Sequence, residues 1–289
     1  MPAVPGGAWV ELPTHPEVAA VHGAVPSLPT VVLVHGAFTG ASSWAGVIER
    51  LQATGLTVHA AANPLRGLAQ DGAYIASVVR RLDVPVVLVG HGYGGAVITH
   101  AAAHRAPHAG ADPGAGPAFG ADNVVSLCYV AALALDAGEC VLDVTSRFAP
   151  MPSTDATLTT PLRARCPAGP EGELYIRRER FPEVYAADLP ASVANVLSVT
   201  QRPLARSALT GRSGPPAWAS RPSWYAIATG DRMLNPTAQR FMAQRMAATE
   251  YLVDGSHAVV LSQPGAVAEM IREAAEQSAA GRGGAPRPT

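Results

Sequence analysis

The chain has 289 residues, of which 48% are hydrophobic, so it can form one large domain with a sizeable core. Its formal net charge is −1, which argues against the basic surface that sequence-independent nucleic-acid binding requires, and we expect no nucleic-acid partner. All 21 basic residues are arginine, and the absence of lysine excludes a Walker A loop and a lysine Schiff base.

The N-terminal residues 1–28 are rich in proline, alanine and glycine without a hydrophobic period, and we expect an irregular arm. The arm has neither the basic region nor the apolar region of a signal peptide. No apolar run in the chain reaches the ~18 residues of a membrane span. Three cysteines at irregular spacing, Cys128, Cys140 and Cys166, are typical of a reducing compartment. We therefore expect a cytoplasmic protein without a membrane partner.

Between residues 29 and 135, apolar β-branched runs alternate with amphipathic stretches. This alternation predicts a parallel sheet with helices on both faces. The strands are expected at 30–34, 56–61, 84–90 and 123–133, and the helices at 43–53, 71–82 and 94–104. A segment rich in glycine and proline, 108–122, predicts a mobile loop.

The alternation fails at residues 136–221, where prolines are frequent and no strand pattern is strong. One stretch, 191–201, has a clear helical pattern. We interpret the whole segment as a small, mostly helical cap inserted between two strands of the sheet.

The core pattern returns at residues 222–278. Asn235 predicts a helix N-cap, with proline at the first helical position. Two strands are expected at 223–229 and 249–254, and a last helix from Pro264 to about Ser278. Residues 279–289 predict a disordered tail.

A glycine-rich turn joins a predicted strand to a predicted helix in the stretch VVLVGHGYGGAV, residues 86–97. It matches the nucleophile elbow G-x-S-x-G at every position except the centre, where Gly92 replaces serine. Glycine adopts a positive φ freely, so the sharp turn is expected to persist. The loss of a serine nucleophile costs on the order of 10⁶ in rate, which excludes an ordinary acyl-enzyme esterase.

Two further polar residues follow predicted strands. Asp231 lies in IATGDR and His257 lies in VDGSHAVV, while HGAF follows the first strand. Open α/β sheets form their sites at the carboxyl ends of the strands. The order of elbow, acid and histidine along the chain is that of α/β-hydrolases.

These motifs identify a resemblance. Over residues 30–278 the chain resembles the α/β-hydrolase superfamily, and it is most similar to small bacterial esterases and to the plant hydroxynitrile lyase and salicylate-esterase group. The matching segments are VVLVHGAFTGASSW, LVGHGYGGAV, ATGDRMLNPTAQRFMA and DGSHAVVLSQP. The resemblance implies an α/β-hydrolase fold with a mostly parallel central sheet and a small cap.

The resemblance also implies roles for individual residues. His257 would be the catalytic base and Asp231 would orient it. The backbone N–H groups of Ala37 and Tyr93 would form an oxyanion hole. Position 92 would hold the attacking serine, and this sequence departs from the family there. The substrate pocket is expected to include Phe38 and His91.

Three hypotheses follow from Gly92. The first is an enzyme without a covalent intermediate, such as a lyase, dehydratase, cyclase or water-activating hydrolase, acting on a small ester- or ketone-type metabolite in bacterial secondary metabolism. The second is a non-catalytic small-molecule binder. The third is an esterase whose nucleophile was engineered to glycine. The histidines show no metal-ligand spacing such as HExxH, so neither a metal nor a cofactor is expected. A homodimer remains possible.

Overall fold

The computed structural model describes residues 27–103, 121–160 and 172–283. At its centre is a six-stranded sheet in which every neighbouring pair is parallel, in the order β2-β1-β3-β4-β8-β9. The strands are β1 (Thr30–Val34), β2 (Val58–Ala61), β3 (Val86–His91), β4 (Val124–Val130), β8 (Ser223–Ala228) and β9 (Thr249–Val253). The predicted parallel α/β architecture is confirmed.

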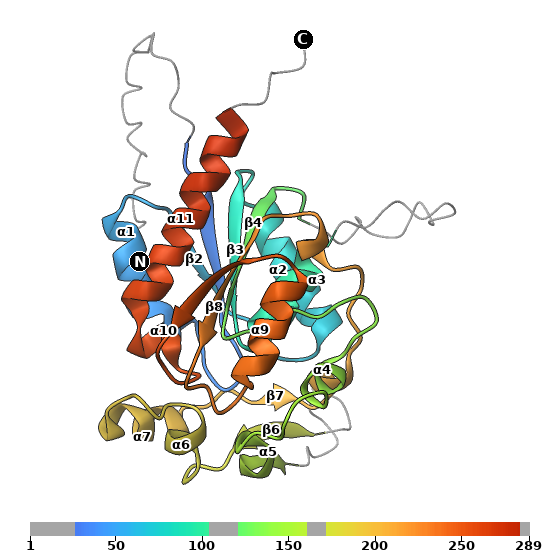
Figure 1. Cartoon of the computed structure of the whole chain (residues 1–289), viewed down its shortest axis with the longest axis vertical. Helices are drawn as coiled ribbons and strands as arrows, with labels where there is room; N and C mark the ends of the chain where they lie inside the picture. Colours follow the sequence, from blue (N-terminus) through green and yellow to red (C-terminus); the bar gives the residue numbers. More distant parts are fainter. Residues whose placement is uncertain (1–26, 104–120, 161–171, 284–289) are drawn as a thin grey trace, which may run out of the picture.

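Helices cover both faces of this sheet (Figure 1). Apolar side chains form one buried cluster on each face, because the inner strands β1, β3 and β4 are rich in branched aliphatic residues that are buried on both sides. One face is covered by α1 (Ala45–Ala53), preceded by η1 (Ala41–Trp44), by α10 (Val259–Ser262) and by α11 (Pro264–Gly283). The other face is covered by α2 (Leu68–Arg80), α3 (Tyr93–Ala101) and α9 (Pro236–Arg245).

The insertion between β4 and β8 lies across one end of the sheet, at the bottom of Figure 1. Its helices are α4 (Val141–Thr145), α5 (Ser153–Ala156), α6 (Phe181–Val184), α7 (Ala191–Val199), α8 (Ser207–Thr210) and η2 (Ala217–Ala219). It also contains an antiparallel sheet of β5 (Thr157–Thr160), β6 (Glu173–Ile176) and β7 (Leu204–Ala205). The sequence showed no strong strand pattern here, since strands this short are specified by backbone pairing and carry too few residues for a visible alternation.

One boundary differs from the sequence prediction. Helix α11 runs to Gly283, so residues 279–283 are helical and the expected disordered tail was wrong there. Ala279 is buried, and this packing extends the helix beyond the last strong apolar repeat. Residues 1–26 of the predicted arm, residues 284–289 and residues 104–120, which hold most of the predicted loop, lie outside the described residues.

The strand order determines where a site can form. Strand β1 lies between β2 and β3, so the connections that leave β1 and β3 diverge from each other. A crevice opens at such a topological switch point, outside the carboxyl ends of the two strands. The HGAF segment follows β1 and Gly92 follows β3, which brings both to this crevice.

Candidate active site

The turn at Gly92 is a sharp bend between β3 and α3. Gly92 has φ 54° and ψ −121°, a conformation that side chains with a Cβ rarely adopt. Its carbonyl oxygen accepts a hydrogen bond from the Leu133 N–H at 2.9 Å, and its N–H donates to Val130 at 3.1 Å. A Cβ on Gly94 would lie 2.4 Å from the Val34 carbonyl oxygen, so α3 packs directly on β1. The backbone of the turn is therefore fixed from both sides.

His257 and Asp231 form a buried pair next to this turn. The Nδ1 atom of His257 lies 2.7 Å from Oδ2 of Asp231, and both residues are almost completely buried. The other carboxylate oxygen of Asp231 accepts backbone N–H groups from Met233 at 2.7 Å and Leu234 at 2.9 Å. Gln239 donates to Oδ2 at 2.8 Å. These donors keep Asp231 in one orientation as a carboxylate acceptor for the imidazole.

The imidazole of His257 presents its second nitrogen to Gly92. With Nδ1 donating its proton to Asp231, Nε2 carries a free lone pair. A Cβ built on Gly92 would lie 3.0 Å from this Nε2, which is closer than ordinary van der Waals contact. The ring therefore occupies part of the volume that a side chain at position 92 would need. A residue with a Cβ at this position would require the ring to move by a few tenths of an ångström.

The two expected oxyanion donors belong to residues that line the same cavity as Gly92. Ala37 follows β1 and precedes Phe38, which has a positive φ of 65°. Tyr93 is the first residue of α3, so its N–H has no acceptor within the helix and lies at the positive end of the helix dipole. The structure brings Ala37, Gly92, Tyr93 and His257 together at one cavity.

The hydroxyl of Tyr93 is engaged in a buried hydrogen bond and is not available for proton transfer at the cavity. The hydroxyl donates to Oδ2 of buried Asp71 at 2.9 Å. Burial and the neighbouring carboxylate raise the pKa of Tyr93 well above its usual value, and burial raises the pKa of Asp71. Asp71 also accepts the backbone N–H groups of Arg66 and Gly67. This bonding fixes the Tyr93 side chain, and with it the start of α3.

The cavity has a volume of about 700 Å³ and lies between the carboxyl ends of the strands and the cap. None of the described residues that line it is an aspartate, glutamate or arginine. Its apolar walls are formed by Phe38, Leu133, Val141, Leu142, Phe148, Met151, Leu174, Leu204, Leu209, Met233 and Leu234. Such a cavity has the size of a small-molecule site. It favours an uncharged ligand, because an ion would lose its hydration without gaining a counter-charge.

Of the two predicted pocket residues, only Phe38 lines the cavity. His91 is completely buried behind the site, and its Nε2 lies 2.8 Å from the carbonyl oxygen of His257. Its ring faces those of Trp44, Tyr185 and His257. The prediction of His91 as a pocket residue was therefore wrong, because side chains of consecutive strand residues point to opposite faces. His91 supports the backbone that carries His257.

Two buried histidines stay neutral around this site. Burial lowers the pKa of His91 to about 3, with a further contribution from the neighbouring His257. Burial also lowers the pKa of His35 to about 4, against the effect of the hydrogen bond between its Nδ1 and the Gly36 carbonyl. The Nε2 of His35 accepts from Arg202 at 3.1 Å. Both rings act as neutral supports of the loops that they contact.

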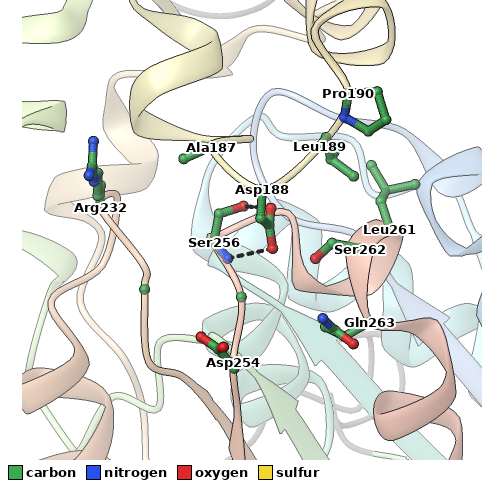
Figure 2. Close-up of a pocket in the computed structure, with 12 residues that line it drawn as sticks. Ala187, Asp188, Leu189, Pro190, Arg232, Asp254, Ser256, Leu261, Ser262 and Gln263 are labelled. Carbon is green, nitrogen blue, oxygen red and sulfur yellow. Dashed lines mark hydrogen bonds between the residues drawn. The ribbon is translucent and has the colours of Figure 1, made fainter.

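Sequence reasoning missed three residues at the site. Gln239 holds Asp231, and its position within the segment PTAQRFMA was the only signal for it. Tyr185 packs edge-on against the His257 ring at 4.9 Å between centroids. Asp188 binds the residue that precedes His257, as Figure 2 shows. The last two lie in the cap, where no sequence pattern was clear.

Neither a metal centre nor a membrane span is found in the described part of the chain. No group of three or more histidine, cysteine, aspartate or glutamate side chains is arranged to hold a metal ion there. Among the described helices, none combines the length and the apolar character needed to cross a membrane.

Comparison with known proteins agrees with this geometry. The family described as "Alpha/beta hydrolase family" matches residues 31–270. The chain belongs to the alpha/beta hydrolase family. No curated protein matches the sequence of this alpha/beta hydrolase.

Several solved structures of esterase type share the fold of this alpha/beta hydrolase. A pyrethroid hydrolase from Sphingobium faniae JZ-2 is 20% identical, with a TM-score of 0.66 over 86% of this chain and 98% of that one. A methylesterase from Arabidopsis is 19% identical, with a TM-score of 0.67 over 86% and 100%. Polyneuridine aldehyde esterase is 15% identical, with a TM-score of 0.69 over 86% and 99%. At these identities the likeness establishes the fold.

Proposed function

We propose that this alpha/beta hydrolase is an enzyme that converts a small, uncharged ester- or ketone-type metabolite without forming an acyl-enzyme. His257 is the general base and Asp231 orients it. The observation that carries the proposal is the Nε2 of His257, which lies beside the backbone of Gly92 at a cavity whose described lining residues include no aspartate, glutamate or arginine. A base in a site that excludes ions and holds no nucleophile at the turn is suited to direct proton transfer.

The chemical step uses groups that meet at Gly92. The substrate carbonyl oxygen is held by the N–H groups of Ala37 and Tyr93, and the Nε2 of His257 removes a proton from the adjacent carbon. The electron pair of that C–H bond moves to the carbonyl oxygen and forms an enolate. The enolate then expels a leaving group or closes a ring, and His257 returns the proton. Elimination and cyclisation fit this scheme. For hydrolysis or C–C cleavage the same base would start from another proton: His257 would take it from a water that adds to the carbonyl carbon, or from a substrate hydroxyl whose carbon then releases the neighbouring carbon as a carbanion, and it would return the proton to the leaving group.

A proton-transfer probe tests the base without knowledge of the natural substrate. The uncharged compound 5-nitrobenzisoxazole opens to a coloured cyanophenolate when a base removes its ring C–H proton. We expect the protein to accelerate this reaction and His257→Gln to lower the acceleration by about 100-fold, because a positioned base contributes at least that much. His59→Gln is the control, because His59 is exposed and does not line the cavity. Equal rates for the His257 variant and the parent would contradict the proposal.

A second prediction concerns the effect of ligand charge on binding affinity. At neutral pH the protein is expected to bind 2-acetylnaphthalene at least about 10-fold more tightly than 2-naphthoate, because the carboxylate would be desolvated without a partner. Fluorescence titration measures both affinities. Leu142 lines the cavity and is 47% exposed, so this position can accept an arginine. We expect Leu142→Arg to reduce the preference for 2-acetylnaphthalene over 2-naphthoate, because the guanidinium would pair with the carboxylate. A parent that prefers the carboxylate would overturn the assignment of an uncharged substrate.

A further inference from the structure

The segment that follows cap helix α6 contacts the loop that carries His257. Asp188 accepts the Ser256 N–H on Oδ2 at 2.8 Å and the Ser256 hydroxyl on Oδ1. Figure 2 shows both bonds side by side at the edge of a surface cleft of about 510 Å³. Ser256 is the residue immediately before His257 and is itself buried. One carboxylate therefore binds both polar groups of the residue next to the base.

Neighbouring backbone contacts make the same connection. The Ala258 N–H, on the other side of His257, donates to the Tyr185 carbonyl oxygen at 2.9 Å. The Tyr185 ring packs against His257, and its hydroxyl donates to the Ala37 carbonyl oxygen at 3.4 Å. His257 is thus held on both sides in sequence by residues of the cap. The same cap segment reaches the loop with the expected oxyanion donor.

The fit around Asp188 leaves little freedom for the loop. A Cβ on Gly255 would lie 3.0 Å from Oδ2 of Asp188, so the carboxylate lies against the loop backbone. Burial alone would raise the pKa of Asp188, but hydrogen bonding, to Ser256 foremost and also to Ser262 and a backbone N–H, outweighs it and the pKa is lowered. Asp188 is therefore ionised at neutral pH and forms charge-assisted hydrogen bonds, the stronger kind.

We propose that Asp188 is a positioning residue, whose carboxylate fixes Ser256 and thereby aims the His257 ring at Gly92. The orientation of His257 depends on the docked cap as well as on Asp231. Because the side chain of His257 rotates with its backbone, a loosened Ser256 moves Nε2 away from the cavity while Asp231 remains in place. The geometric claim stands on these contacts alone, and its consequence for the rate rests on the proposed function.

Imidazole NMR of protein labelled with ¹⁵N-histidine tests the geometry directly. In the parent we expect a downfield Nδ1 proton signal for His257, assigned by its loss in His257→Gln. In Asp188→Ala we expect that signal to shift or broaden. Asp188→Asn keeps one acceptor and should give a smaller change, and Ser256→Ala, which removes only the hydroxyl, serves if the Asp188 variants do not fold. An unchanged signal in a folded Asp188→Ala protein would overturn the proposal.

Kinetics with 5-nitrobenzisoxazole separate positioning from simple cap docking. Asp188→Ala is expected to lower kcat by about 10-fold with little change in KM, since misplacing a catalytic group by a fraction of an ångström reduces its effectiveness. Asp254→Asn is the matched control, because Asp254 lines the same cleft on the same loop but does not bind Ser256. A raised KM with unchanged kcat would overturn the positioning role. If the parent is inactive, the proposed function fails, whereas the NMR result still decides the role of Asp188.

Discussion

The variant Gly92→Ser is expected to gain hydrolysis of 4-nitrophenyl acetate, with a burst of nitrophenolate equal to the enzyme concentration, while the parent gives no burst. The hydrogen-bonded pair of His257 and Asp231, the expected oxyanion residues and the turn already meet at position 92. Serine supplies the missing nucleophile, and removal of such a serine from a triad enzyme costs about 10⁶ in kcat. We expect a partial gain, on the order of 10³-fold in turnover.

The gain is partial because the site is fitted to glycine. The new Cβ would lie 3.0 Å from Nε2 of His257, so the ring must move by a few tenths of an ångström. The positive φ of 54° also strains any residue with a side chain, at a cost of about 1–3 kcal/mol. Gly92→Ser should therefore unfold at a lower denaturant concentration than the parent. The same strain is expected in Gly92→Ala.

Two controls give this experiment its meaning. Gly92→Ala has the same backbone strain without a nucleophile and should show neither burst nor added turnover. Gly92→Ser combined with His257→Gln should lose most of the gain, because the serine then has no base. A burst from the parent itself would show that it forms an acyl-enzyme and would contradict the proposed function. No gain in a folded Gly92→Ser protein that still binds 2-acetylnaphthalene would indicate that His257 and position 92 are not aligned for nucleophilic attack.

The free energy of unfolding is expected to fall steeply as the pH drops from 6.5 toward 4. The pKa values of His35 and His91 lie at about 4 and about 3 in the folded protein, below their ordinary value of 6.5. Below pH 6.5 the unfolded chain binds protons at these two histidines that the folded protein excludes, and burial lowers the pKa of His100 in the same direction, so acid favours unfolding. Above pH 6.5 both states are unprotonated and this contribution is constant. Each histidine adds about 1.4 kcal/mol per pH unit, or about 3 kcal/mol per pH unit together.

Urea unfolding at a series of pH values between 7 and 4.5 measures this slope. His91→Gln keeps a donor near the position of Nε2, and His35→Asn keeps one near Nδ1, so each substitution preserves one hydrogen bond and removes the titration. Each variant should reduce the slope between pH 6 and 4.5 by about 1.4 kcal/mol per pH unit, whatever its stability at pH 7. His59→Gln, at an exposed position, should leave the slope unchanged. If both variants show the same dependence of unfolding free energy on pH as the parent, His35 and His91 are not buried as neutral rings.

The strands and the site differ in how far the sequence predicts them. Strands β1, β3 and β4 are apolar runs between turn signals, and a central parallel strand buried on both faces requires that composition. The Asn235 cap was also predicted, and its side chain accepts the Thr237 N–H at 2.9 Å. The cap strands were missed, because β5 and β6 depend on pairing with each other more than on a local pattern.

The residues around His257 follow the same division. Asp231 and His257 follow strands in a recognisable order, so their proximity was expected, and the structure places them 2.7 Å apart. Tyr185 and Asp188 reach the same loop from a segment more than 65 residues earlier in the chain, as their contacts with Ser256 record. Nothing in their local sequence distinguishes them from surface residues of the cap. They contact this loop only because the cap packs over the carboxyl ends of the strands.

The sequence by itself determined the parallel sheet, the turn at Gly92 and the order of elbow, acid and histidine, because periodicity and turn chemistry are local properties of the chain. Only the tertiary structure decided that His91 lies behind the site, that the described part of the cavity wall has no aspartate, glutamate or arginine, and that the cap binds the loop of His257. These features depend on which distant side chains meet when the elements pack. Burial and contact across the fold are not encoded by any single stretch of sequence, and packing alone sets them.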